Sequence, residues 1–162
     1  GFFDVRLPRN QDDEFNFRVK KAGFAIVLSS RIRSRYHVRA SFGKLFRQYR
    51  QYGYWKVFVN ALHGTVTTWR QLVPALFVGY LLLASIGLFL FPALWWWCAP
   101  VILYLVVAVA CALSAGGVAD FPGVMLAFFI LHVGYGIGYW QGIWHFLILR
   151  RAPATLSASL TR

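Results

Sequence analysis

The sequence predicts an α-helical membrane segment of two to three transmembrane helices, which follows the C-terminal end of a smaller soluble part with α/β structure. Composition is the first of two observations behind this prediction. Hydrophobic residues make up 59% of the 162 residues and charged residues 14%, whereas soluble domains average about 45–50% and about 25%. Charge distribution is the second. Twelve Lys and Arg lie between positions 15 and 70, but residues 71–149 contain a single fully charged side chain, Asp120.

Three apolar segments are long enough to cross a membrane, because the hydrocarbon core of a bilayer needs about 20 helical residues. We expect transmembrane spans at about 73–91, 94–113 and 121–149. Pro92 predicts a tight hairpin between the first two, since proline cannot continue a helix without losing a hydrogen bond. The tryptophans at 95–97 then lie at the hairpin tip, because aromatic side chains favour the headgroup region.

A run of small residues, 114–120, is expected to form a loop before the third span. That span holds 29 residues, more than one crossing requires. Within it, Gly134, Gly138 and Gly142 recur every four residues and share one helix face. Such glycines predict close packing against another helix, and a groove for a lipid chain is the alternative. Residues 150–162 are expected to form a polar tail.

The soluble half begins with an acidic triplet, Asp12-Asp13-Glu14, that predicts the first turn of a helix. Acidic side chains are favourable at the positive end of the helix dipole, and Gly23 suits the position that ends a helix. Two strands are expected after it. One is the apolar run 24–28, predicted to be buried, and the other is 31–39, where basic residues alternate with others.

A basic amphipathic helix is predicted from Ser41 to Lys56, where aromatic residues at helical spacing are interleaved with Lys and Arg. Residues 57–72 are expected to be a juxtamembrane linker. Positive charges near the ends of spans mark the cytoplasmic side, so Lys56 and Arg70 place the basic half in the cytoplasm. Three complete spans would put Arg150 and Arg151 outside, which leaves open whether the third segment crosses fully.

Three functions could explain the basic half. A polybasic surface beside a membrane attracts anionic lipid, which explains the charge but not the acidic triplet. A nucleic-acid site would use the same basic and aromatic residues, but the apolar spans argue against it, and we expect no nucleic-acid partner. An enzyme that acts on phosphorylated substrates uses both features. Its Lys and Arg would neutralise a diphosphate leaving group, and a carboxylate would deprotonate an acceptor hydroxyl.

Two blocks of the sequence resemble one enzyme family. Residues 9–18, RNQDDEFNFR, followed by KAG at 21–23, are similar to the acidic signature late in the catalytic domain of family 2 glycosyltransferases. Residues 45–56, LFRQYRQYGYWK, resemble the Q-x-x-R-W motif of the same family. The closest resemblance is to the membrane-bound, succinoglycan-biosynthesis type, in which hydrophobic spans also follow the catalytic domain.

The resemblance implies that residues 1–56 are the end of a GT-A-type α/β catalytic domain, joined to a transmembrane region at 73–149. The implied reaction transfers a sugar from a nucleotide sugar to a polyisoprenyl-linked or polysaccharide acceptor. It would serve exopolysaccharide biosynthesis on the cytoplasmic side of a bacterial inner membrane, in contact with membrane lipid. The family's D-x-D motif, which holds a divalent metal (Mg or Mn) against the donor diphosphate, does not occur in these residues. We therefore expect a fragment of a longer enzyme that binds no metal by itself and is inactive alone.

Carried over residue by residue, the family's Glu-Asp pair falls on Gln11 and Asp12. The resemblance implies that Asp12 is the catalytic base, which takes the proton from the acceptor hydroxyl. Asp13 is the alternative base. Glu14 stands where the family often has a second acid that helps to hold the site. Because Gln11 replaces the usual Glu, support for the base is altered while the base itself is kept.

The second block matches its motif in two registers. Gln48 is the first residue of one register, with Gln51 and Tyr52 where Arg and Trp would stand; the other starts at Gln51 and keeps the tryptophan at Trp55. The resemblance places these four residues near the acceptor and the leaving group, and an anchor at the membrane interface is the alternative for the aromatic ones. For the whole chain, the alternative is a non-enzymatic membrane protein whose basic segment binds lipid or a partner.

Overall fold

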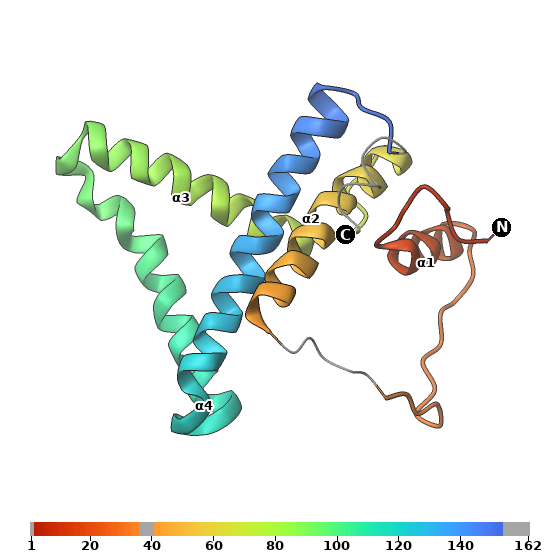
Figure 1. Ribbon diagram of the computed structural model, residues 1–162, viewed down its shortest axis with the longest axis horizontal. Coiled ribbons are helices and arrows are strands. Elements are labelled where there is room, and N and C mark those ends of the chain that lie inside the picture. Colours follow the sequence, from red (N-terminus) through yellow and green to blue (C-terminus); the bar gives the residue numbers. More distant parts are fainter. Residues whose placement is uncertain (1, 36–40, 154–162) are drawn as a thin grey trace.

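The computed structural model describes residues 2–35 and 41–153, apart from the side chains at 116 and 117, and in these residues the regular structure is entirely helical. Figure 1 shows helix α2 lying between α1 and the second half of α4. The long helices are α1 (Gln11–Lys21), α2 (Phe42–His63), α3 (Val73–Leu90) and α4 (Ala99–Gly142), and the short helical turns are η1 (Trp69–Leu72), η2 (Pro92–Cys98) and η3 (Ile143–Ile148).

Helix α1 confirms the prediction made from the acidic triplet. Its acidic residues lie in the first turn and its basic residues in the last, which complements the helix dipole. Gly23 adopts a left-handed φ of +86°, and its N–H donates to the Lys20 carbonyl at 3.0 Å. The next N–H, of Phe24, donates to the Val19 carbonyl at 3.1 Å. This paired arrangement is a Schellman motif, so the helix ends where the glycine allows it.

The two predicted strands are not strands in the described residues. Residues 24–28 lie in the chain that connects α1 with α2, without a ladder partner, and Val27 and Leu28 are almost fully exposed. The described part of the second, 31–35, is likewise irregular, and 36–39 lie outside the described residues. A β-strand is stabilised by hydrogen bonds to neighbouring strands. The described residues contain no other strand with which either segment could pair. The GT-A-type α/β structure is therefore not seen here.

Helix α2 starts where the sequence predicts and ends later. The Ser41 hydroxyl caps it by accepting from the Lys44 N–H at 3.3 Å. The helix continues through Lys56 to His63 and ends at Gly64, whose φ is +63°. The first seven residues of the segment expected to be a linker are therefore helical.

Helix α2 packs against the C-terminal half of α4 along the predicted glycine stripe. The contacts advance four residues at a time on both helices: Phe46 with Gly134, Arg50 with Gly138, and Tyr54 with Gly142. Both helices therefore run in the same direction. A Cβ atom at Gly138 would overlap the backbone carbonyl of Arg50. A Cβ atom at Gly142 would lie 2.6 Å from the backbone carbonyl oxygen of Tyr54. The prediction of close packing is confirmed, and the partner is the basic helix rather than another apolar span.

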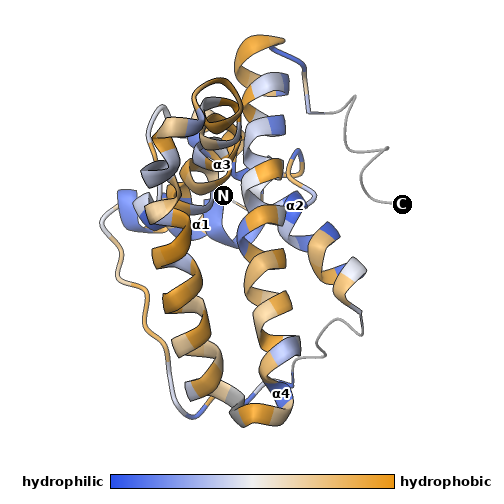
Figure 2. Cartoon of the chain, turned by 90° about the vertical axis from the view of Figure 1, so that its left-hand side faces the viewer, coloured by the Kyte–Doolittle hydropathy of each residue, from blue (hydrophilic) through white to orange (hydrophobic). Residues whose placement is uncertain are grey.

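The predicted membrane half is confirmed as three helical segments long and apolar enough to cross a bilayer, Trp69–Leu90, Pro92–Ala115 and Val118–Ile148. In Figure 2, α3 and α4 are predominantly orange, the hydrophobic colour. The hairpin is also confirmed, because the chain turns at Pro92 and η2 carries the three tryptophans at the tip. Trp97 packs there against Gly87, where a Cβ would lie 2.7 Å from its ring.

The prediction of a loop at 114–120 is wrong, because these residues are helical and belong to α4. Figure 1 nevertheless shows the ribbon of α4 bending sharply near its middle, so that its halves form two arms. Pro122 lies inside the helix near this bend, and proline both removes a backbone donor and clashes with the preceding turn. Pro100 produces no such break, since it occupies the first turn of α4, where proline is tolerated.

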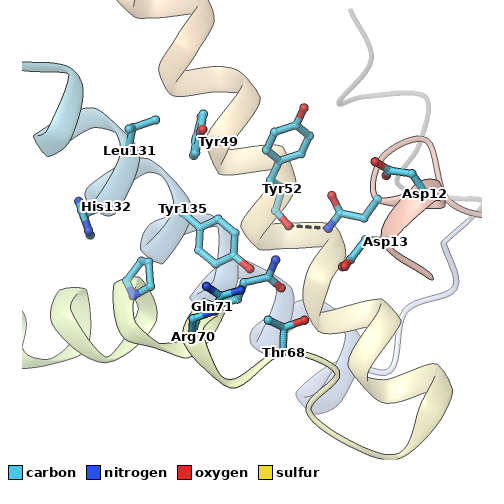
Figure 3. A pocket seen from close by; sticks show the side chains of 12 residues that line it. Asp12, Asp13, Tyr49, Tyr52, Thr68, Arg70, Gln71, Leu131, His132 and Tyr135 are labelled. Carbon is cyan, nitrogen blue, oxygen red and sulfur yellow. Dashed lines mark hydrogen bonds between the residues drawn. The ribbon is translucent and has the colours of Figure 1, made fainter. Parts of the chain in front are cut away.

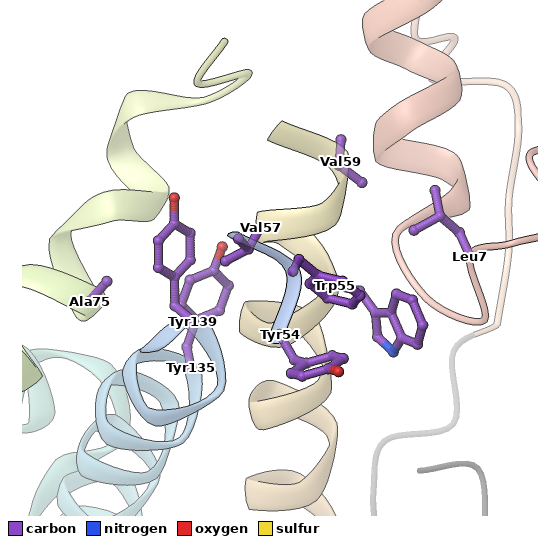
Figure 4. Close-up of a cluster of buried hydrophobic side chains, with 9 residues drawn as sticks. Leu7, Tyr54, Trp55, Val57, Val59, Ala75, Tyr135 and Tyr139 are labelled. Carbon is purple, nitrogen blue, oxygen red and sulfur yellow. The ribbon is translucent and has the colours of Figure 1, made fainter. Parts of the chain in front are cut away.

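The buried core lies on both sides of α2 (Figure 4). On one side Trp55 and Val59 lie toward Leu7, at the start of the chain, and on the other Tyr135 and Tyr139 of α4 pack beside α2. Helix α2 is therefore the element that joins the acidic helix to the apolar arms. The core consists of Leu7, Tyr54, Trp55, Val57, Val59, Ala75, Tyr135, Tyr139 and Phe146.

Candidate functional site

The three consecutive acids of α1 have three different surroundings. Successive residues of a helix point about 100° apart, so neighbours in sequence face different parts of the molecule. Asp12 is exposed and has no ion-pair partner among the described residues. Asp13 is partly exposed and forms an ion pair with Lys56 of α2. Glu14 is buried, and its Oε1 accepts from Arg18 at 2.7 Å and lies 3.1 Å from His63 Nε2.

Polar contacts fix the start of α1 against the middle of α2. The Asn10 amide donates to the Tyr52 carbonyl at 2.9 Å, and the Arg9 guanidinium donates to the Gln51 side chain at 3.1 Å. Asn10 holds a left-handed φ of +62° directly before the helix. Non-glycine residues adopt this conformation rarely. These contacts set the position from which Asp12 projects.

A cleft of about 700 Å³ opens between α1, α2 and the membrane helices. Figure 3 shows the Asp12 and Asp13 side chains at one side of it, with Tyr135, Arg70 and Gln71 facing them from α4 and η1. The lining residues are Asn10, Asp12, Asp13, Tyr49, Tyr52, Thr68, Arg70, Gln71, Pro74, Leu131, His132 and Tyr135. The cleft thus joins the soluble acids to the apolar half of the chain.

The electrostatics of the cleft separate Asp12 from its neighbours. Lys56 is 1% exposed, and a buried ammonium is stable only with an anionic partner, which Asp13 supplies. On the far side of α1, hydrogen bonding to Glu14 raises the pKa of Arg18. Asp13 and Glu14 are thus each committed to a cation. Asp12 is the carboxylate that remains available in the cleft.

The residues of the second motif divide between cleft and core. Tyr52 lines the cleft, and its hydroxyl accepts from the Gln48 amide at 2.7 Å. Gln48 and Gln51 are both buried in α2 and support Tyr52 and Arg9. Trp55 is fully buried in the core. The structure therefore brings Asp12, Asp13 and Tyr52 together but not Glu14 or Trp55.

The sequence analysis missed the membrane-side wall of the cleft. Tyr135 is 8% exposed and its hydroxyl has no hydrogen-bond partner among the described residues. The Gln71 Oε1 atom is also buried and likewise has no hydrogen-bond partner among the described residues. His132 lines the same cleft. Its Nδ1 atom lies 3.4 Å from the Tyr104 hydroxyl and 2.9 Å from the Phe128 carbonyl oxygen. Tyr135 directly follows a glycine of the packing stripe, and that position was the only local signal.

Comparisons with models of protein families, with curated proteins and with solved structures gave no match.

Proposed function

We propose that this chain is the acceptor-side part of a membrane-bound glycosyltransferase of family 2. The enzyme transfers a sugar from a nucleotide sugar to a lipid-linked or polysaccharide acceptor, and exopolysaccharide biosynthesis is the process it serves. The proposal places the catalytic part in the cytoplasm and the apolar helices in a bacterial inner membrane. The observation that carries it is Asp12, which is exposed and unpaired among the described residues at a cleft between the soluble helix and the membrane helices.

In the proposed reaction the acceptor hydroxyl lies in the cleft against Asp12. The carboxylate takes the hydroxyl proton while the hydroxyl oxygen attacks the anomeric carbon of the donor. The bond between that carbon and the diphosphate oxygen breaks, and the nucleoside diphosphate leaves with the bonding electrons. A carboxylate base of this kind contributes typically 10²–10⁴-fold to a rate. Asp13 supports it indirectly, because its ion pair with Lys56 fixes α1 against α2.

The family resemblance assigns the divalent metal to a D-x-D motif, which these residues do not contain. The described residues contain no group of three or more His, Cys, Asp or Glu placed to hold a metal ion. Asp13 and Glu14 are already paired with cationic side chains. We therefore assign no step to a metal in this chain, and the donor diphosphate belongs to the nucleotide-binding part of the proposed enzyme.

The test is sugar transfer by membranes from cells that express the complete reading frame. Membranes are incubated with a panel of radiolabelled nucleotide sugars, and label is counted in extracted lipid and in polymer. Asp12→Asn removes the base without changing the shape of the side chain, so we expect a loss of 10²–10⁴-fold. Asp120→Asn is the matched control, since the same chemical change is made at the far bend of α4, and it should retain wild-type transfer. Equal transfer by both variants would refute the role of Asp12.

A second function is favoured by the segment that connects α1 with α2. Phe24, Val27, Leu28 and Ile32 are exposed beside exposed basic residues at 31, 33 and 35. Such a segment suits the surface of an anionic membrane, as expected for a non-enzymatic lipid-binding protein. That function predicts vesicle binding that depends on the three arginines, no sugar transfer with any donor, and no effect of Asp12→Asn.

A further inference from the structure

Two buried polar atoms on the membrane side of the cleft have no partner among the described residues. One is the hydroxyl of Tyr135, on α4, and the other is Oε1 of Gln71, in η1. Both residues line the cleft that Asp12 faces. Figure 3 shows them together on one wall, with Arg70 alongside. Leaving a buried polar group without a hydrogen bond is unfavourable, so two on one wall point to a group that enters the cleft.

The chemistry of the two atoms is complementary. A phenol hydroxyl donates one hydrogen bond, and an amide oxygen only accepts. An alcohol hydroxyl placed between them would satisfy both, because it accepts from Tyr135 and donates to Gln71. A carboxylate or phosphate could accept from Tyr135 but would be repelled by the Gln71 oxygen. The pair therefore suits a group that both accepts and donates a hydrogen bond, as an alcohol hydroxyl does.

The rest of the cleft suits a carbohydrate. Tyr49 and Tyr52 line it on the α2 side and offer aromatic rings, while Asp12 offers a carboxylate acceptor on the α1 side. Pro74 and Leu131 make the adjoining wall apolar. A molecule with several hydroxyls and an attached hydrocarbon chain would match these surroundings.

We propose that Tyr135 and Gln71 form a hydroxyl-binding subsite for a carbohydrate at the membrane-side wall of this cleft. That this carbohydrate is the acceptor rests on the proposed function; that the subsite binds a sugar does not. Its hydroxyls could belong to a lipid-linked sugar or to a free one, and the shared chemistry is the alcohol group. Both residues are ligand-binding groups and take no part in proton transfer.

The first test uses the stability of the full-length protein without added sugar. Tyr135→Phe removes an unpartnered oxygen, so the thermal unfolding midpoint should stay the same or rise. Tyr139→Phe is the matched control, one turn further along α4. The Tyr139 hydroxyl accepts from the Asn60 amide at 3.1 Å, so this variant should unfold at a lower temperature. A lower midpoint for Tyr135→Phe would overturn the proposal, because the hydroxyl would then have a partner within the protein.

The second test measures binding to the full-length protein in an alkyl polyoxyethylene detergent, which offers no sugar ring. The probes are glucosyl-diacylglycerol, diacylglycerol and free glucose, titrated by microscale thermophoresis. We expect the glucosyl lipid or free glucose to bind, and diacylglycerol to bind more weakly than its glucosylated form. Tyr135→Phe and Gln71→Met should each weaken sugar binding about three- to ten-fold, as for one lost hydrogen bond. Tyr139→Phe should bind like wild type.

The two sugar probes separate the sources. Binding of the glucosyl lipid without free glucose indicates a membrane-anchored carbohydrate, and binding of free glucose indicates that the subsite recognises the sugar alone. Equal binding of glucosyl-diacylglycerol and diacylglycerol, or unchanged binding in both variants, would overturn the proposal. In the transfer assay Tyr135→Phe should raise the acceptor KM and leave kcat near wild type, whereas Asp12→Asn lowers kcat. Sugar binding without any transfer would refute the proposed function and leave the subsite standing.

Discussion

The two faces of α2 are held to their neighbours by different forces. Toward α4, the two backbones are in direct contact. Gly53 and Gly138 have no side chain, so the carbonyls of Tyr135 and Arg50 can approach the facing helix closely. Toward α1, long polar side chains make specific contacts, with the ion pair between Lys56 and Asp13 among them, beside the apolar packing of Leu7 near Trp55.

This difference indicates which part of the cleft is rigid. Close backbone packing tolerates few substitutions, because protein interiors are close-packed and a single added methyl group already lowers stability. Side-chain ion pairs and hydrogen bonds reach further and depend on charge. The wall that carries Tyr135 is therefore fixed by close backbone packing, whereas the wall that carries Asp12 depends also on ion pairs and hydrogen bonds. Three substitutions, two of them paired with a control variant, can break or sharpen this comparison.

The largest effect on stability should come from Asp13→Asn, which breaks the electrostatic side. It leaves Lys56 as a buried and unpaired ammonium, a change that typically costs about 3–5 kcal/mol. The free energy of unfolding in detergent micelles measures it.

Lys56→Met is the comparison for that change. It leaves Asp13, whose carboxylate is 34% exposed and can be hydrated, so we expect a cost of about 1 kcal/mol. If Lys56→Met costs as much as Asp13→Asn, burial of the lysine is not what makes the pair necessary.

Gly138→Ala breaks the shape-dependent side. Its Cβ would overlap the backbone carbonyl of Arg50, which cannot rotate away as a side chain would. Overpacking typically costs about 1–3 kcal/mol, and we expect the upper end of that range. Loss of contact between α2 and α4 can be followed by cysteine cross-linking across the two helices.

Gly123→Ala is its control in the same helix, because nothing lies within 4 Å of the added methyl group. Alanine is the better helix former, so this variant should be neutral or up to about 1 kcal/mol more stable. Equal destabilisation by both substitutions would show that the glycines serve backbone flexibility rather than close approach.

Tyr54 sharpens the comparison, since it belongs to the packed face yet carries a titratable group. Burial raises the pKa of its hydroxyl from 10 to about 12, an effect that Arg151 partly offsets. The hydroxyl also lies 2.9 Å from His145 Nδ1. Between pH 10 and 12 the unfolded chain has released the proton that the folded chain keeps, so stability falls as pH rises.

We expect that decrease to be on the order of 2 kcal/mol between pH 10 and 12, since each pKa unit corresponds to about 1.4 kcal/mol. It can be measured by chemical unfolding at a series of pH values. Tyr54→Phe should abolish this part of the pH dependence. An unchanged slope in that variant would mean that other tyrosines account for it.

Much of the fold could be predicted because its signals are local. Charge depletion indicates the spans, Pro92 the hairpin, and Gly23 the end of α1. The strand predicted at 24–28 is wrong because its apolar composition says only that the segment favours burial. Among the described residues, no other segment covers it, and Val27 and Leu28 are exposed.

The candidate site was predicted in part. Asp12 and Tyr52 could be found because each lies in a short motif, but the different surroundings of Asp12, Asp13 and Glu14 depend on where α2 lies. Tyr135 and Gln71 are 64 positions apart in the sequence. No pattern in either neighbourhood indicates that they share a wall, since only the packing of α4 brings them together.

The most direct measurement of the central claim compares kcat for sugar transfer with acceptor binding in Asp12→Asn and Asp120→Asn. If Asp12 is the base, Asp12→Asn lowers kcat by at least about 100-fold, while its acceptor Kd stays within about three-fold of wild type and Asp120→Asn changes neither quantity. A kcat for Asp12→Asn equal to that of Asp120→Asn would contradict the account, because the exposed carboxylate at the cleft would then have no part in the chemistry.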